Sequence, residues 1–172
     1  MKVILYAAIT ANGVAAKKDG NSDWVSSEDT ASFNTICQKV GCAIMGRHTF
    51  EIYNQMPVNQ WPNQEGLHIV LTSRDSLNTK HPKILLATTP VRALDIAGNQ
   101  GLGEVVIMGG SRTFGSFMKE NLVDEVFLDI EPLAFGEGMP LFIAGDFETK
   151  LDLIETKLLS PQTVQLHYQI KK

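Results

Sequence analysis

The sequence is short of cysteine and has no cluster of metal-ligating side chains. Its two cysteines, Cys37 and Cys42, lie five positions apart and form no C-x-x-C motif. The four histidines are scattered along the chain. The sequence therefore predicts no metal site and no serine–histidine–aspartate triad. Packing in the core is favoured over a redox role for both cysteines.

Basic clusters and long apolar runs are missing as well. The chain has a formal net charge of −4, and its lysines and arginines form no basic run, whereas nucleic-acid binding needs clustered cations. The apolar run at residues 3–9 is too short to span a bilayer, and no small-residue cleavage site follows it. We therefore expect a cytoplasmic protein without a nucleic-acid or membrane partner.

The sequence does have an ordinary globular composition and a regular alternation of elements. Hydrophobic residues make up 44% and charged residues 20% of the 172 residues, which predicts a single domain over residues 1–172. Short apolar runs alternate with segments of helical periodicity. The predicted strands are 2–10, 42–45, 68–71, 84–87, 104–108 and 123–130. The predicted helices run from Ser26 or Ser27 to Gly41, over about 49–55, over about 90–98, and onward from Gly110.

The tail of the chain has a different pattern. Apolar and polar residues alternate at about 151–157 and 163–170, which is typical of an antiparallel strand pair. Together with the earlier alternation, this predicts an α/β fold with three layers, α-β-α. Its mixed sheet would end in the C-terminal antiparallel pair.

Three strand ends carry groups suited to phosphate. Gly46–Thr49 and Gly109–Thr113 each join a buried strand to a helix. Glycine lets a ligand approach the backbone there, and the free N–H groups of a helix start attract anions. Arg47 adds a planar guanidinium that matches phosphate oxygens. Leu71–Arg74 ends another strand with two hydroxyls and a guanidinium, which suits the 2′-phosphate that distinguishes NADP from NAD.

Each of these turns has an ordinary explanation when taken alone, as a tight turn or a surface arginine. The Rossmann pattern G-x-G-x-x-G is absent, because the next glycine after Gly110 is Gly115. Open α/β sheets, however, bind ligands at the carboxyl ends of their strands. The coincidence of three such strand ends therefore favours one groove for a nucleotide cofactor.

Taken together, these segments make the sequence resemble the dihydrofolate reductase-like superfamily. Residues 45–50, M-G-R-H-T-F, are similar to that family's M-G-R-x-T-[WF] cofactor segment. Gly109–Gly110 is similar to its Gly-Gly turn, which implies a cis peptide against the cofactor. Residues 7–13 resemble the first strand and the mobile loop beside the nicotinamide. Trp24 and Asp29 resemble the family's tryptophan and the carboxylate that opens the substrate-side helix.

The later segments are similar to one branch of that superfamily. Residues 121–126 contain L-V-D-E and residues 135–142 contain G-x-G-x-P-L-F. These resemble the reductase domain of the riboflavin-pathway bifunctional deaminase–reductase and its stand-alone relatives. The resemblance implies a homodimeric, NADPH-dependent oxidoreductase of riboflavin biosynthesis. It would transfer a hydride to a C=N bond of a small pyrimidine- or pterin-type heterocycle.

The resemblance also implies which residues form the site. Asp29 and Asp129 are the candidate catalytic residues, with Asp29 as the anchor of an amidine-like N–C–N edge and Glu28 as the alternative to it. Trp24 and Phe33 either line the substrate pocket or pack in the core. No metal ligand is implied. The implied cofactor-binding residues are Ala8, Asn12, Gly13, Gly46, Arg47, His48, Thr49, Leu71, Thr72, Ser73, Arg74, Met108, Gly109, Gly110, Ser111, Arg112 and Thr113.

Two departures from the family pattern leave the substrate open. No arginine or lysine lies between Arg47 and Arg74, where folate-reducing members place the arginine that pairs with the folate carboxylate. The first loop has a valine where riboflavin-pathway members carry a basic residue for the ribose phosphate. Lys17 and Lys18 are the nearest substitutes.

The sequence leaves three alternative functions to compare with this one. A true dihydrofolate reductase would need a different cation for the folate tail. A non-catalytic NADP-binding module would bind the cofactor without oxidising it. A flavodoxin-like protein fits poorly, because no loop rich in serine and threonine follows the first strand.

Overall fold

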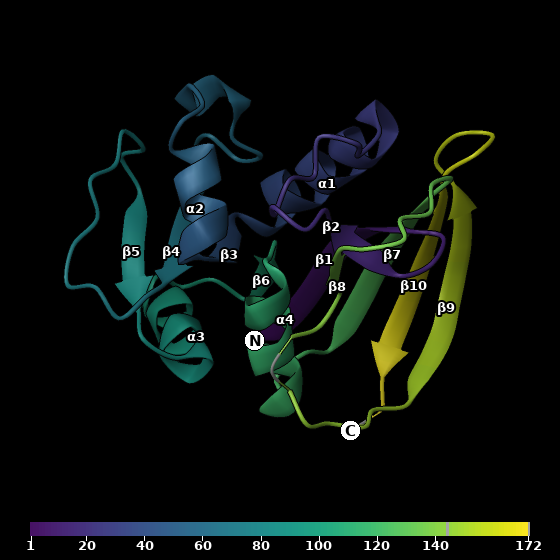
Figure 1. The fold of residues 1–172 in the computed structure, drawn as a ribbon. Coiled ribbons are helices and arrows are strands. Elements are labelled where there is room, and N and C mark those ends of the chain that lie inside the picture. The colour runs from purple at the N-terminus through teal and green to yellow at the C-terminus, as the bar shows by residue number, and fades with distance from the viewer. Residues whose placement is uncertain (144, 172) are drawn as a thin grey trace.

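The chain folds around a sheet of eight strands with helices on both faces (Figure 1). The structure is a computed structural model and describes residues 1–143 and 145–171. The strands of this sheet are β1 (Lys2–Thr10), β3 (Cys42–Gly46), β4 (Leu67–Leu71), β5 (Ile84–Ala87), β6 (Glu104–Ile107), β7 (Glu125–Glu131), β9 (Leu151–Leu158) and β10 (Val164–Ile170). The helices are α1 (Ser27–Val40), α2 (Arg47–Tyr53), α3 (Pro90–Asn99) and α4 (Ser111–Lys119), with a short 3-10 turn η1 (Val58–Gln60).

The order of the strands across the sheet is β5-β4-β3-β6-β1-β7-β10-β9. The strands from β5 to β7 run parallel to one another. β10 pairs antiparallel with β7, and β9 pairs antiparallel with β10. The predicted mixed sheet with a C-terminal antiparallel pair is confirmed. Its parallel strands all end at one edge, which therefore gathers the turns that follow them.

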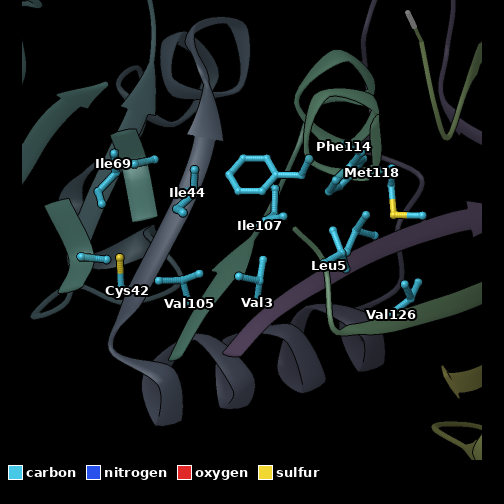
Figure 2. Packing of buried hydrophobic residues seen from close by; sticks show 14 of the residues in the cluster. Val3, Leu5, Cys42, Ile44, Ile69, Val105, Ile107, Phe114, Met118 and Val126 are labelled. Atoms are coloured by element: carbon cyan, nitrogen blue, oxygen red, sulfur yellow. The ribbon is translucent and has the colours of Figure 1, made fainter. Parts of the chain in front are cut away.

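One face of the sheet packs against α3 and α4. Leu5, Ile44 and Ile107 point toward Phe114 and Met118 of α4, as Figure 2 shows. Side chains of neighbouring strand residues point to opposite faces, so each central strand supplies an apolar row to both layers. This explains why the parallel strands are continuous hydrophobic runs in the sequence.

The other face packs against α1 and α2. Tyr6 and Val106 lie against Cys37 and Val40 of α1, while Phe50 of α2 belongs to a separate apolar cluster on the same face. Both cysteines are buried and unpaired, which confirms that they pack in the core. None of the described helices is long and apolar enough to cross a membrane.

The structure corrects several predicted boundaries. The segments expected as loops contain a small antiparallel pair, β2 (Val14–Ala16) with β8 (Met139–Pro140). These strands have three and two residues, too few to give a periodic signal. Helix α2 begins two residues earlier than expected, because Gly46 is extended and serves as its N-cap. Strand β7 begins at Glu125 rather than at residue 123. Val123 is buried in the segment before the strand, which explains the apolar signal there.

A pair of isoleucine variants tests this core. Ile44 is fully buried between the layers, and Ile52 of α2 is 44% exposed. We expect Ile44→Ala to lower the free energy of unfolding by about 2–5 kcal/mol, because it removes buried methyl groups and leaves a cavity. Ile52→Ala should change it by no more than about 0.5 kcal/mol. Urea denaturation measures both, and equal losses would contradict the assigned layers.

Candidate active site

The two glycine turns at the carboxyl edge of the sheet touch each other. The backbone N–H of Gly46, at the end of β3, donates a hydrogen bond of 2.7 Å to the carbonyl of Gly109, after β6. A Cβ atom added at Gly46 would lie only 2.5 Å from Oγ1 of Thr113. The predicted groove requires the two turns to lie close together, and the structure confirms that they do.

The Gly109–Gly110 peptide bond is cis, as the resemblance implied. Gly109 also has a φ of +117°, a conformation that favours glycine over any other residue. The hydroxyl of Thr49 faces this pair, since a Cβ at Gly110 would lie 3.6 Å from Thr49 Oγ1. Gly110 is exposed at the surface. The turn therefore presents bare backbone beside a hydroxyl.

The helix starts at the two glycine turns differ from those of α1 and α3. Helices α1 and α3 are capped by the side chains of Ser26 and Thr89. The N-caps of α2 and α4 are Gly46 and Gly110, which make no side-chain cap hydrogen bond. The N–H groups in the first turn of α4 thus face the groove without a capping side chain and are suited to an anionic ligand.

Three basic side chains gather around one glutamate on α2. Glu51 forms an ion pair with Arg47, and its carboxylate also lies 3.5 Å from His48 Nδ1 and 3.8 Å from Arg74 Nη1. Arg74 follows β4, and its backbone N–H donates to Thr72 Oγ1 at 3.1 Å. The two predicted phosphate-binding segments, 46–49 and 71–74, therefore lie side by side. Exposed ion pairs are worth little, so the two guanidinium groups are available to a stronger anion.

The first loop is tied to the segment after β7. The amide of Asn12 donates to the carbonyl of Phe135 at 2.7 Å and accepts from Thr10 Oγ1, also at 2.7 Å. A cavity of about 500 Å³ lies between this loop and residues 135–140. Ala8 of β1 is half-buried and stands in register with Asp129 of β7. The predicted cofactor residues Asn12 and Gly13 thus line this cavity, and Ala8 lies next to Asp129 in the sheet.

Asp29 and Asp129 form a buried carboxyl group pair under α1. Asp29, in the first turn of α1, is 5% exposed, and Asp129 of β7 is fully buried. Tyr6 donates its hydroxyl proton to Asp129 Oδ2 at 2.5 Å, and Gln165 Nε2 donates to Asp129 Oδ1 at 2.9 Å. Glu131, two residues further along β7, is 2% exposed. Strands β1, β7 and β10 and the start of α1 therefore contribute to one acidic cluster.

Asp29 and Asp129 have pKa values raised above the usual range of an aspartate. Burial, then the hydrogen bond and charge of Asp129, raises the pKa of Asp29 to about 8. Burial also raises the pKa of Asp129, against the lowering effect of the hydrogen bonds from Tyr6, Asp29 and Gln165. These shifts favour the protonated form of Asp29 at neutral pH. A protonated carboxyl group can act as an acid.

The two predicted aromatic residues pack against other rings. Phe33 is half-buried, with its ring centroid 5.0 Å from that of Tyr6. Trp24 packs edge-on against Phe135 with centroids 5.5 Å apart. Phe33 thus lies beside the acidic cluster, and Trp24 lies against a residue that lines the first-loop cavity. Glu28 is exposed and accepts a hydrogen bond from Ser27, so Asp29 is the acidic residue of α1 that points into the cluster.

Sequence reasoning missed Tyr6, Glu131 and Gln165. Glu131 accepts from the backbone N–H and the hydroxyl of Ser26 at 3.0 and 2.6 Å. It therefore fixes the residue that caps α1 and, through it, the position of Asp29. A signal was present, because acidic residues at every second position of a buried strand, 129 and 131, are unusual. Their common partners became visible only with the strand register.

The chain has clear relatives among known proteins. A family model described as the RibD C-terminal domain matches residues 1–165. The "Uncharacterized protein YwjB" of Bacillus subtilis (strain 168) is 35% identical over 173 residues, which cover 97% of each chain.

Solved structures share the fold. A protein from Shewanella sp. PV-4, described provisionally as a riboflavin biosynthesis protein, superposes with a TM-score of 0.85, 24% identity and full coverage of both chains. Dihydrofolate reductase from Enterococcus faecalis, solved as a complex with NADP(H), superposes with a TM-score of 0.72 and 20% identity, covering 99% of this chain and 97% of that one. The fold is therefore of the dihydrofolate reductase-like kind.

The proton on Asp29 predicts a pH dependence of stability. The folded protein keeps this proton up to about pH 8, whereas an unfolded chain releases it near pH 4. Stability contributed by this group is thus present below about pH 4 and falls as the pH rises toward 8, by up to about 1.4 kcal/mol per pH unit. Asp29→Asn should flatten this slope because an amide does not titrate in this range, and its N–H₂ group can still donate toward Asp129.

Urea denaturation at several pH values between about 5 and 8 measures the slope. Asp95→Asn, at an exposed position on α3, is the matched control and should leave the slope unchanged. A slope that is the same in Asp29→Asn and the wild type would contradict the assigned protonation.

Proposed function

The chain belongs to the family described as the RibD C-terminal domain, and from this premise we propose that it is an NADPH-dependent reductase of the riboflavin-pathway type. Its substrate would be a small pyrimidine- or pterin-type heterocycle with a C=N bond. One observation carries the proposal, namely the hydrogen bond that joins the turn at Gly46 to the turn at Gly109. It brings two strand ends into contact, as a single groove for a dinucleotide would require.

The residues along the groove fit a phosphorylated dinucleotide. A side chain at Gly46 would collide with Thr113, so glycine is needed there for the two turns to approach each other. Gly110 and the first turn of α4 would hold the pyrophosphate. Arg47, with Arg74 near it, would pair with the 2′-phosphate, because guanidinium groups bind phosphate in a planar, bidentate manner. NADPH bound in this way would supply a hydride to the substrate.

The acidic cluster would supply the proton for the proposed reaction. An imine accepts a hydride more readily when its nitrogen is protonated, and Asp29 holds a proton at neutral pH. Phe33 and Trp24 beside it would keep water from the reacting atoms. The chain's part in the reaction is therefore to orient the heterocycle, to exclude water and to offer a proton.

The riboflavin-type assignment is preferred over a true dihydrofolate reductase. No lysine or arginine occurs between Arg47 and Arg74, and a folate carboxylate would need such a cation. Enzyme assays distinguish the riboflavin-type reductase, the true dihydrofolate reductase and the non-catalytic NADP-binding module from one another.

We also propose one reductase domain over residues 1–172, acting as a cytoplasmic homodimer. Strand β9 supports pairing with a second copy. It lies at the edge of the sheet, all eight of its residues are exposed, and Leu153, Ile154 and Leu158 are each more than half exposed. Edge strands of this kind are normally covered.

Cofactor affinity tests the groove. We expect Arg47→Ala to weaken NADPH binding by about 1–3 kcal/mol and NADH binding much less, because only NADPH carries the 2′-phosphate. Isothermal titration calorimetry with both nucleotides measures this difference. Arg92→Ala, at an exposed position on α3, is the control. Equal binding of both nucleotides to the wild type and to Arg47→Ala would remove the cofactor assignment.

Turnover tests the substrate class. We expect NADPH oxidation with a ribosylaminopyrimidine and a rate at least about tenfold lower with dihydrofolate, whose carboxylate lacks a cationic partner here. Absorbance of the reduced nicotinamide follows both reactions. NADPH binding without oxidation of either substrate would favour the non-catalytic module, and faster turnover of dihydrofolate would favour a true dihydrofolate reductase.

A further inference from the structure

The first loop, residues 11–18, is joined along its whole length to residues 133–140. The backbone N–H of Ala11 donates to the carbonyl of Leu133 at 2.8 Å. Strand β2 of the loop pairs with β8 of the other segment, and the two lie side by side in Figure 1. The cavity of about 500 Å³ lies between these two segments. Their contacts therefore decide whether the loop can swing away from the cavity.

Asn12 makes the central contact between the two segments. Its Nδ2 atom donates to the carbonyl of Phe135 at 2.7 Å, and its Oδ1 atom accepts from the N–H of the same residue at 3.2 Å. The side-chain amide thus pairs with a peptide group through a donor and an acceptor at once. Oδ1 also accepts from Thr10 Oγ1, at the end of β1, at 2.7 Å. Asn12 therefore links β1, the first loop and the segment after β7.

The two glycines in residues 136–140, G-E-G-M-P, have different surroundings. A Cβ atom added at Gly138 would collide with Val14 Cγ1 and would lie 2.6 Å from the carbonyl oxygen of Ala16. A Cβ atom added at Gly136 would meet nothing within 4 Å. Neither glycine has a positive φ, so the close approach to β2 is what distinguishes them. Only the second glycine is needed for the loop to lie against this segment.

Each of these contacts is weak when taken alone. The ion pair of Lys18 with Glu137, at 3.0 Å, joins side chains that are 83% and 75% exposed, and such pairs contribute little. Hydrogen bonds at the exposed Asn12 compete with water. The contacts follow one another along the chain, however, so the entropy of ordering the loop is lost once for all of them. Loss of a central contact should therefore release the loop as a unit.

We propose that Asn12 and Gly138 are positioning residues that hold the first loop as a fixed wall of the cavity, so that the loop does not open and close as a lid. The inference rests on the proposed reductase function for what the cavity receives. It departs from the mobile loop that the resemblance implied. The cavity is formed before a ligand arrives, and binding needs no closure of the loop.

Amide hydrogen exchange in the protein without nucleotide tests the wall directly. The reporter is the N–H of Ala11, because its hydrogen bond joins the two segments. We expect it to exchange at least about a hundredfold more slowly than in an unstructured peptide. Gly138→Ala should lower this protection at least about tenfold, and Gly136→Ala, the matched control, should keep it. An unprotected Ala11 in the wild type, or equal effects of the two variants, would overturn the proposal.

Asn12→Asp gives the central contact a pH profile of its own. A protonated aspartate can donate to the Phe135 carbonyl as the amide does, whereas an ionised one would repel that oxygen. The protection of Ala11 in this variant should therefore be near the wild-type value below about pH 4 and fall as the pH rises through that value. Lys18 and Glu137 are the charged side chains nearby, and they are the same in the wild type, which should lack this step.

Urea denaturation at each pH separates a local opening of the loop from a global loss of stability. We expect the free energy of unfolding of Asn12→Asp to follow that of the wild type across the range, while only the loop loses protection. Identical pH profiles of Ala11 protection in the two proteins would contradict the role of Asn12.

Stopped-flow binding of NADPH tests the consequence for the site. With a fixed wall, the observed rate in the wild type should rise linearly with nucleotide concentration, because no closure step follows the encounter. A rate that reaches a plateau would indicate a closing lid and would overturn the proposal.

The proposed function and the fixed wall fail separately. A protein with a protected Ala11 that binds no NADPH would refute the reductase function while supporting the wall. A protein that binds and oxidises NADPH with an unprotected Ala11 would refute the wall alone.

Discussion

The hydrogen bond from the Gly46 N–H to the Gly109 carbonyl is the contact on which the candidate groove depends. It joins two segments that are more than sixty positions apart in the sequence. The approach is so close that a single methyl group on Gly46 would meet the Thr113 hydroxyl. Parallel strands β3 and β6 lie next to each other in the sheet, so their carboxyl ends are brought together before any side chain is considered. Because Gly46 has no side chain, the two turns can then come into contact.

Much of this architecture was predictable, because its signals are local. Apolar runs such as residues 42–45 and 105–108 predict strands that are covered on both faces. Gly41 predicts the end of α1, and it lies in the left-handed region with a φ of 77°. The position of the phosphate-compatible turns followed from the rule that parallel strands end at one edge. The small pair β2 and β8 was not predictable, because strands of two or three residues have no measurable period.

The acidic cluster could be predicted only in part. Asp29 and Asp129 were candidates from the resemblance and from their places in the chain, but nothing local connects Tyr6 or Gln165 to them. That connection needs the register of three strands, in which Asp129 stands opposite Ala8 on one side and opposite Gln165 on the other. Buried carboxyl groups without cations lower stability. Three of them kept together are therefore the reason to place the candidate site at this cluster.

Glu51 gives the basic end of the groove a further property. It occupies Arg47 and lies near His48 and Arg74 when no ligand is bound. An arriving anion therefore competes with a carboxylate that is covalently attached to the same helix, and the affinity measured is the difference between two pairings. If the proposed cofactor binds here, a weakly charged anion would lose that competition, whereas a phosphate monoester with two negative charges would be favoured. The internal counter-ion would then set a threshold for the anions that this end of the site accepts.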